Sequence, residues 1–301
     1  MPELPDVEVY VTHLRRRTVG AMLERTRVAS PFVVRSFDPP LGAAHGNRVV
    51  EVRRVGKRIA FGLEDDLWLV LHLMIAGRLR WDEKGAKIPG KVGLAAFDFS
   101  SGTLLLREAS TKKRASVHLL RGQAALDELD PGGIEPLAAD VSAFAAALRR
   151  EVHTLKRALT DPRVFSAIGN AYSDEILWRA RQSPVRRTSA MTDEQIETLH
   201  VATQATLREW TERLLLEAGD DFPEKVTAFR PEMAVHGRYG QPCPACGAPV
   251  QRIAYAENES NYCARCQTAG KLLADRSLSR LMHGDWPKTL DALESMKARR
   301  G

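Results

Sequence analysis

The chain has 301 residues, of which 44% are hydrophobic and 27% charged, as in an ordinary soluble globular protein. A chain of this length holds about two domains and a sizeable core. No apolar run approaches the roughly 18 residues of a membrane span, and the N-terminus lacks the basic and apolar regions of a signal peptide. These features argue against a membrane-spanning or secreted protein, so we expect a cytoplasmic protein with reduced thiols.

The basic residues occur in separate clusters along a chain with a net charge of +6 and a pI near 9.2. A polyanionic partner, above all a nucleic acid, fits this distribution. Solvated faces of helices and strands give the same pattern, so charge alone leaves both interpretations open. The clusters are Arg15-Arg16-Arg17, Arg53-Arg54, Lys57-Arg58, Lys112-Lys113-Arg114, Arg149-Arg150 and Arg186-Arg187.

The N-terminal half begins with a predicted helix and continues with predicted strands. Apolar residues at roughly helical spacing indicate a helix over residues 6–19. Between residues 49 and 120, short and partly alternating apolar runs are separated by Gly, Asp and Ser, which predicts an antiparallel β-sandwich or barrel. The clearest predicted strands are residues 58–63, 67–73, 95–99 and 103–106.

The C-terminal half is predicted to be helical after a linker centred on Asp130-Pro131-Gly132-Gly133. Before one of the helices, an apolar segment ends at Gly169-Asn170, and Ser173 is the predicted N-cap. A helix N-terminus beside such a turn suits a phosphate, although the pattern alone favours an ordinary packing corner between helices. The predicted helices cover residues 140–150, 154–159, 173–181 and 192–218.

The first residues, Met1-Pro2-Glu3-Leu4-Pro5, contain a candidate nucleophile. Removal of Met1 would leave Pro2 with a free secondary amine. An α-amino group titrates at roughly 8, so part of it is an uncharged nucleophile that can form a Schiff base. Glu3 is placed to transfer protons for this amine. The alternative is a frayed terminus without a function.

The four cysteines of the chain form two Cys-x-x-Cys pairs separated by sixteen residues, Cys243 with Cys246 and Cys263 with Cys266. This spacing predicts a tetrahedral site for one structural zinc ion. Two disulfides are disfavoured in a reducing compartment, and a redox pair would not need two motifs. Because all four positions are filled by protein ligands, the zinc is not expected to catalyse.

Four features in this order resemble the formamidopyrimidine-DNA glycosylase / endonuclease VIII family. They are the Pro2-Glu3-Leu4-Pro5 start, Gly56-Lys57 before a strand, the turn Ile168-Gly169-Asn170-Ala171-Tyr172, and the four-cysteine finger. The resemblance implies an α+β multidomain fold. Its expected parts are an N-terminal catalytic β-sandwich with flanking helices (1–126), a linker (127–139), a helix-two-turn-helix domain (140–234), a zinc-finger β-hairpin (235–270) and a C-terminal extension (271–301).

The resemblance also implies a base-excision-repair enzyme that removes damaged, oxidised bases and then nicks the strand by elimination. Pro2 would be the nucleophile, Glu3 the general acid/base, and Lys57 a phosphate contact that supports the lyase steps. The expected partner is double-stranded DNA with damaged bases or abasic sites. We expect a monomer, associated with the nucleoid if the source is bacterial. A lyase restricted to abasic or single-stranded DNA, or a non-catalytic relative that only binds DNA, are the alternatives.

Further DNA contacts follow from the resemblance, but several positions depart from its pattern. Lys156 and Asn170 match residues that hold phosphates. The family fills the space left by the flipped base with a methionine, an arginine and a phenylalanine. Here these positions are taken by Ile75 (with Met74 adjacent), Lys113 and Arg114. Lysine lacks the bidentate fork of arginine, whereas Arg114 can still stack on bases.

The finger and the C-terminus depart from the family pattern as well. Glu257-Asn258-Glu259 stands where the family has a phosphate-binding arginine, and two carboxylates beside a phosphate would be repulsive. The extension after the finger contains seven basic and four acidic residues, with a predicted helix over residues 288–299. Contact with DNA and packing against the finger are both consistent with this composition.

Overall fold

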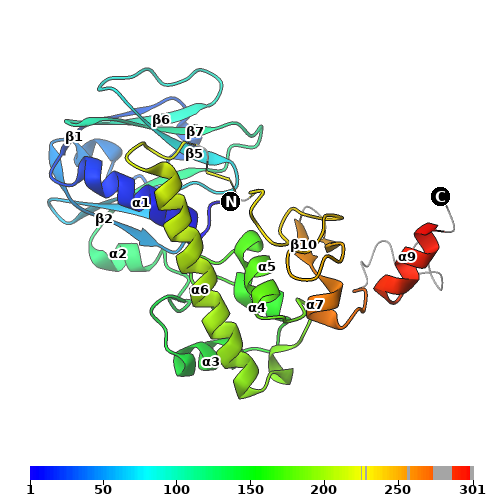
Figure 1. The fold of residues 1–301 in the computed structure, drawn as a ribbon. Coiled ribbons are helices and arrows are strands. Elements are labelled where there is room, and N and C mark those ends of the chain that lie inside the picture. The colour runs from blue at the N-terminus through cyan, green and yellow to red at the C-terminus, as the bar shows by residue number, and fades with distance from the viewer. Residues whose placement is uncertain (225, 228, 256–257, 274–286, 299–301) are drawn as a thin grey trace. The chain divides into compact units, whose positions relative to one another are not determined.

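The computed structural model describes residues 1–301 except 225, 228, 256–257, 274–286 and 299–301 (Figure 1). The chain divides into two compact units. Unit 1 contains residues 1–132 and 209–228, and unit 2 contains residues 133–208 and 229–301. None of the helices within the described ranges is both long and apolar enough to cross a membrane.

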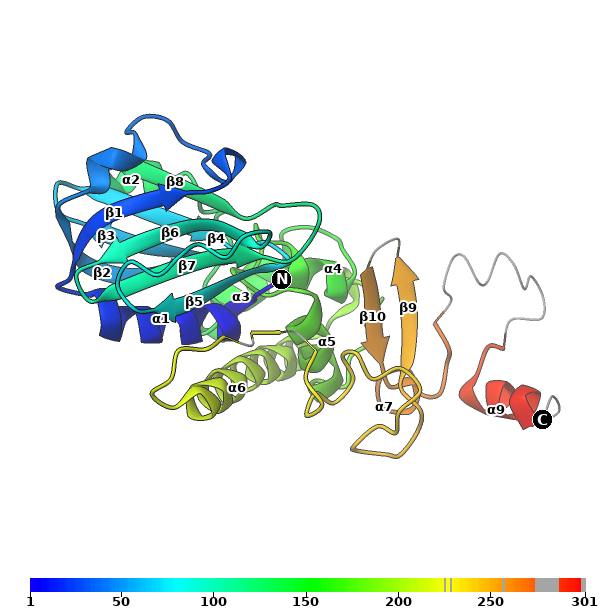
Figure 2. The same cartoon turned by 90° about the horizontal axis from the view of Figure 1, so that it is seen from above.

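Unit 1 is built on an eight-stranded antiparallel sheet with the order β5-β7-β6-β1-β2-β3-β4-β8 (Figure 2). Only two residue pairs join β1 to β2, so the sheet divides there into two four-stranded halves. Phe61 of one half stacks on Phe99 of the other with 5.9 Å between ring centroids, as expected for the inner layer of the predicted sandwich. The strands are β1 (Met22–Val28), β2 (Asn47–Val55), β3 (Arg58–Leu63), β4 (Leu67–His72), β5 (Gly77–Asp82), β6 (Gly93–Phe99), β7 (Gly102–Glu108) and β8 (Ser116–Arg121).

The helix α1 (Leu4–Thr18) packs against β2 and β3 and buries one apolar side in the core of unit 1. Tyr10 on this helix lies 5.7 Å from Phe222, centroid to centroid, which shows how residues 209–228 join the unit. The expected helix at residues 6–19 is therefore confirmed, with an earlier start. Shorter elements are the 3-10 helices Pro31–Val33 and Leu41–Ala44 and the helix α2 (Gln123–Asp127).

Unit 2 is helical apart from the hairpin of its zinc finger. Two of its helices have side-chain caps, with Asp140 accepting from Ala143 N–H at 2.7 Å and Thr154 accepting from Arg157 N–H at 3.4 Å. The elements are α3 (Val141–Arg149), α4 (Leu155–Thr160), α5 (Asn170–Arg179), the 3-10 helix Thr188–Ala190, α6 (Asp193–Ala218), which runs on into unit 1, β9 (Gln251–Tyr255), β10 (Asn258–Tyr262), α7 (Ala264–Thr268) and α9 (Leu290–Ala298).

The prediction that Ser173 caps a helix is wrong. Helix α5 begins at Asn170 with the extended residue Gly169 as its N-cap, and Ser173 lies inside the first turn, where its hydroxyl donates to Gly169 O at 2.5 Å. A serine followed by two acids is typical of a helix start. Here the two acids, Asp174 and Glu175, are instead buried and accept hydrogen bonds from other segments.

Candidate active site and zinc centre

The N-terminus of α1 fixes the position of Glu3. Glu3 and Asp6 form a capping box, in which Glu3 N–H donates to Asp6 Oδ2 at 2.9 Å and the Glu3 side chain accepts from the Asp6 backbone N–H. Both residues are buried, as is Pro2. Asp6 thus serves as the reciprocal cap, and the Glu3 carboxylate is held one residue from Pro2.

Lys57 lies in the two-residue turn between β2 and β3, next to Gly56, whose φ of +57° is in the left-handed region. Burial lowers the pKa of the Lys57 ammonium, and the negative charge of Glu3 opposes this shift. Burial also lowers the pKa of the terminal amine on Met1, again against the charge of Glu3, while Lys57 contributes to the lowering. The charge of Glu3 therefore acts on both Lys57 and the terminal amine of Met1, the residue before Pro2.

His72 is a member of this neighbourhood that the sequence did not reveal. It is the last residue of β4 and pairs with Arg58 of β3 on one side and Ser116 of β8 on the other. Burial, with the charges of Arg58 and Lys57, lowers the pKa of His72 to about 4. The imidazole is therefore neutral near pH 7. Only the strand register places it beside Lys57, so no local sequence signal could have identified it.

The turn after β4 presents Ile75 to solvent, with 54% of its surface exposed. Met74 adopts a left-handed conformation (φ +52°), and Gly77 N–H closes the turn on Leu73 O at 2.9 Å. A Cβ on Gly77 would lie 2.3 Å from that carbonyl oxygen. The turn is thus tightly specified, and it exposes Ile75 while leaving Met74 partly buried.

The loop before β8 is organised by the buried Glu108. Its carboxylate accepts from the backbone N–H groups of Arg114 and Ala115, at 2.8 and 3.0 Å. The Lys113 ammonium donates to the carbonyls of Glu108 and, at 3.2 Å, of Lys91. The Arg114 side chain is exposed. Two residues of this loop are expected to fill the space left by the flipped base. Of these, Arg114 is exposed to solvent, whereas the Lys113 side chain folds back and binds main-chain carbonyls.

In unit 2, Lys156 and Asn170 lie together around Asp174. The Lys156 ammonium donates to Asn170 O at 2.6 Å and forms an ion pair with Asp174 Oδ1 at 2.5 Å. Asn170 Nδ2 donates to the carbonyl of Glu259 on β10 at 2.8 Å. The two expected phosphate contacts are therefore adjacent, but each also has partners within the protein.

Two consecutive acids of α5 connect this helix to the finger. Asp174 is fully buried and accepts from His236 Nδ1 (2.8 Å), Ser260 Oγ (2.8 Å) and Asn261 N–H (3.0 Å) in addition to Lys156. Glu175 accepts from the backbone N–H groups of residues 234, 235 and 236 at 2.7–2.9 Å. Burial raises the pKa of Glu175, against these hydrogen bonds.

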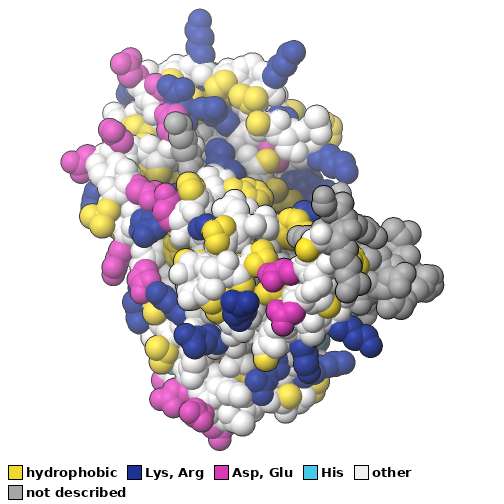
Figure 3. Space-filling model, turned by 45° about the vertical axis from the view of Figure 1, so that its right-hand side comes forward, with side chains coloured by type: hydrophobic (Ala, Val, Ile, Leu, Met, Phe, Trp, Pro, Cys, Tyr) yellow, Lys and Arg dark blue, Asp and Glu magenta, His cyan; other side chains and the backbone are white. Residues whose placement is uncertain are grey.

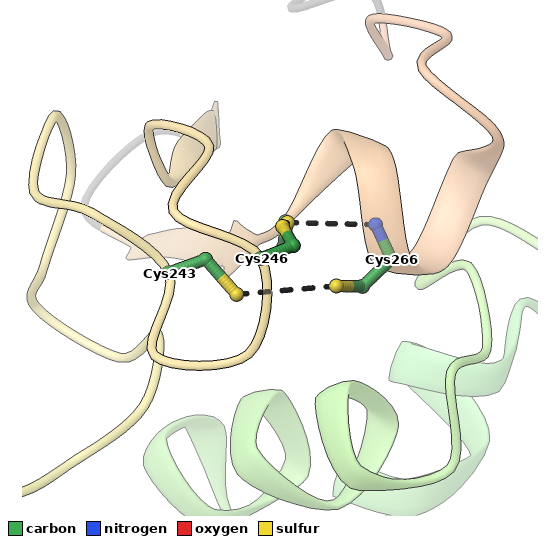
Figure 4. Close-up of side chains that lie close together, drawn as sticks. Cys243, Cys246 and Cys266 are labelled. Atoms are coloured by element: carbon green, nitrogen blue, oxygen red, sulfur yellow. Dashed lines mark hydrogen bonds between the residues drawn. The ribbon is translucent and has the colours of Figure 1, made fainter.

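The four cysteines come together as predicted. All four Sγ atoms lie within 4.8 Å of one another, with 3.9 Å between Cys243 and Cys266 and 3.4 Å between Cys246 and Cys263. Tetrahedral zinc with Zn–S distances near 2.3 Å requires S–S separations of about 3.8 Å. Figure 4 shows the Cys243 and Cys266 side chains pointing toward each other. The site fits one zinc ion held by four thiolates.

The surface is consistent with the dispersed basic clusters of the sequence. On the face drawn in Figure 3, Lys and Arg side chains occur in many separate places with Asp and Glu between them. Charge of this kind supports binding to a polyanion but does not identify it.

Three family models match successive parts of the chain. The formamidopyrimidine-DNA glycosylase N-terminal domain matches residues 1–116, the formamidopyrimidine-DNA glycosylase H2TH domain residues 133–214, and the zinc finger found in FPG and IleRS residues 240–269. The formamidopyrimidine-DNA glycosylases of Heliobacterium modesticaldum and Thermus thermophilus are each 32% identical over 282 and 276 residues. These matches cover 89% and 90% of this chain and the whole of each relative.

Solved structures agree with the sequence comparisons. The MutM (Fpg) protein from Thermus thermophilus is 31% identical, with a TM-score of 0.74 over 88% of this chain and 98% of that one. The Lactococcus lactis Fpg in complex with DNA containing an abasic site is 25% identical, with a TM-score of 0.77 over 88% of this chain and 99% of that one. The resemblance seen in the sequence is thus confirmed, and the chain belongs to the formamidopyrimidine-DNA glycosylase / endonuclease VIII family.

Proposed function

We propose that this DNA glycosylase and AP lyase of base excision repair uses the Pro2 nitrogen as its nucleophile, Glu3 as its general acid/base and Lys57 as a supporting cation. The observation that carries the assignment is the buried Glu3 beside Pro2 in unit 1, whose negative charge acts on both the chain terminus and Lys57. A nucleophilic amine beside a carboxylate and an ammonium is the set that imine chemistry on a sugar requires.

The reaction runs on a base that has been turned out of the duplex, because its glycosidic carbon is otherwise enclosed by the stack. The Pro2 lone pair attacks C1′ of the sugar, and the bond from C1′ to the base breaks with its electron pair leaving on the base. The Pro2 nitrogen then gives up its proton to Glu3. Glu3 donates a proton to the ring oxygen, which opens the sugar and leaves an iminium on Pro2. Loss of a C2′ proton then expels the 3′ phosphate and cuts the strand, and water releases the enzyme.

This mechanism requires removal of Met1, since the Pro2 nitrogen is otherwise an amide. Pro2 lies deeper than Met1, which is 40% exposed. Burial already lowers the pKa of the amine on Met1, and we expect it to act in the same direction on the amine of Pro2 after processing. A lowered pKa increases the uncharged, nucleophilic fraction at neutral pH.

The substrate is double-stranded DNA that contains oxidised bases or abasic sites, bound by a monomer. Solved Lactococcus lactis Fpg complexes contain Fapy-dG DNA and abasic-site DNA, which supports this substrate class. In unit 1, exposed Ile75 and Arg114 enter the space of the flipped base, with Met74 and Lys113 behind them. In unit 2, Lys156 and Asn170 contact phosphates. A bacterial cell would hold such an enzyme at its nucleoid.

The decisive experiment is borohydride trapping on a duplex with an abasic site, using protein whose intact mass shows that Met1 is absent. We expect a covalent adduct that peptide mapping assigns to Pro2. Pro2→Gly and Glu3→Gln should lose excision of oxidised bases yet keep DNA affinity, whereas Glu24→Gln, an exposed carboxylate on β1, should behave as the parent. No adduct from the processed chain would refute the assignment. An adduct without excision of any damaged base would indicate an abasic-site lyase.

A further inference from the structure

Residues 288–290 in the C-terminal segment (271–301) pair with residues 270–272 at the end of the zinc finger. The finger match ends at residue 269, and relatives matched over their whole length cover 89–90% of this chain, so about a tenth of it is outside the match. Among the described residues of this part, Lys271 and Thr289 form an antiparallel bridge. Leu272 N–H donates to Lys288 O at 3.0 Å, and Leu290 N–H donates to Gly270 O at 2.9 Å. Main-chain hydrogen bonds therefore hold residues 288–290 against residues 270–272.

Side chains of the same segment belong to the buried apolar cluster that contains the zinc-binding cysteines. Leu290 is 1% exposed and belongs to one buried cluster with Cys243, Cys263 and Val250. Leu272 packs on this cluster. A leucine buried in the same apolar cluster as two of the four cysteines helps to exclude water from that side of the site.

A second contribution comes from helix α5. Trp178 packs on the same cluster, and its Nε1–H donates to Cys243 Sγ at 3.4 Å. A zinc ion with four thiolates carries two net negative charges, and an N–H donor to sulfur together with an apolar surround stabilises such a centre. The zinc site is thus completed by residues from outside its own hairpin.

We propose that the C-terminal segment, through Leu290, is part of the zinc centre of this protein. Leu290 completes the apolar cluster that contains Cys243 and Cys263 and thereby slows the loss of zinc. Loss of zinc requires this apolar cluster to open, so that water or a chelator can reach the sulfur atoms. Because a buried leucine favours the closed state, removing it raises the population of the open state. The inference concerns metal retention and does not depend on the catalytic assignment.

The test measures zinc release from the zinc-loaded full chain with the chromogenic chelator 4-(2-pyridylazo)resorcinol in excess. Leu290→Ala should release zinc roughly ten- to hundred-fold faster than the parent, the factor expected for exposing a leucine side chain. The matched control is Leu293→Ala, since Leu293 lies one turn further along α9 and is only partly buried. It should release zinc at the parent rate.

A truncation that ends at residue 286 gives the second measurement, and circular dichroism before chelation checks that each variant is folded. Fast release from Leu290→Ala and from the truncation, with parent-like release from Leu293→Ala, supports the proposal. Parent-like release from the truncated chain overturns it. Equal acceleration by both leucine variants also overturns it, because the effect would then come from α9 as a whole. If Leu290→Ala does not fold, Leu290→Val replaces it and should give a smaller acceleration in the same direction.

Discussion

Lys156 has two expected roles, a contact to a DNA phosphate and an ion pair with Asp174, and one substitution can test both. It is the residue expected to hold a phosphate, yet its ammonium is 2.5 Å from the buried Asp174 carboxylate and donates to Asn170 O. Two of its three N–H donors are therefore directed into the protein. Lys156→Met keeps the length of the side chain and removes the charge, so it perturbs both roles at once, but the two roles leave different signatures.

The structural role predicts a loss of stability. After Lys156→Met, Asp174 keeps its hydrogen bonds from His236, Ser260 and Asn261. The cost should therefore be that of one hydrogen bond to a charged group, about 1.5–3 kcal/mol in the free energy of unfolding. Asp174→Asn instead leaves an ammonium that is 11% exposed without its counter-ion, and breaking a buried pair in this way costs about 3–5 kcal/mol. Urea unfolding of the zinc-loaded chain measures both values.

The phosphate role predicts a change in the salt dependence of DNA binding. Each phosphate contact contributes about 0.9 to the slope of log K against log salt concentration. The slope for Lys156→Met on an abasic-site duplex should thus be smaller by about 0.9, while Lys156→Arg should keep the parent slope. A reduced affinity with an unchanged slope would refute the phosphate contact and leave Lys156 as the partner of Asp174. A stability loss below about 0.5 kcal/mol would refute the ion-pair argument.

Four further predictions address other parts of the chain. The pKa of His72 is lowered to about 4, so folding favours its neutral form and the free energy of unfolding decreases as the pH drops from about 6.5 to 4. In His72→Gln this decrease should be smaller by about 3 kcal/mol, as measured by urea unfolding at several pH values. Burial lowers the pKa of Lys57, so the DNA affinity of the parent relative to Lys57→Arg should fall with rising pH before the ordinary lysine pKa of about 10.4 is reached, as titrated by fluorescence anisotropy. Chelation of zinc under reducing conditions should abolish tight DNA binding in the same assay, and added zinc should restore it, because the finger core includes the cysteines. Gly77→Ala should destabilise unit 1 by more than about 1 kcal/mol, since its Cβ meets Leu73 O at 2.3 Å. Thermal unfolding tests this, with Gly90→Ala as a surface control, because a Cβ on Gly90 meets no atom within 4 Å.

The parts of the site that sequence reasoning could identify are those whose chemistry is local. Cysteine pairs at fixed spacing determine a metal site before any fold is known, and the thiolates indeed converge. Glu3 is adjacent to Pro2 in the chain, so its proximity needed no structure. The strand pattern between residues 49 and 120 was readable because the inner face of each strand is apolar.

The parts that could not be predicted depend on pairing between distant segments. His72 reaches the neighbourhood of Lys57 through the register of β3 and β4. Asp174 and Glu175 read as helix-start acids, but their partners come from residues 234–236 and 260–261, far along the chain. A buried carboxylate with four donors has no signature in a single sequence, because the sequence does not show burial.

The acidic finger tip shows how a departure changes meaning once the backbone is known. From the sequence, Glu257 and Glu259 beside a phosphate would be repulsive. Glu257 lies outside the described residues, whereas Glu259 belongs to β10 and its carboxylate lies 3.5 Å from Arg252 Nη1. This exposed pair is weak, but it reduces the local charge. The stronger contribution of Glu259 is its carbonyl, which accepts from Asn170 Nδ2 at 2.8 Å.

Any residue at position 259 could offer that carbonyl, so the acidic side chain does not prevent the hairpin from contacting α5. An amide nitrogen has two hydrogens, and the Glu259 carbonyl orients Asn170 through one of them. The other hydrogen is the donor that a phosphate can use. We therefore propose that the hairpin contributes to DNA binding mainly by positioning Asn170, and that the zinc contributes by holding the hairpin. Loss of zinc should consequently weaken phosphate binding even though no cysteine touches DNA.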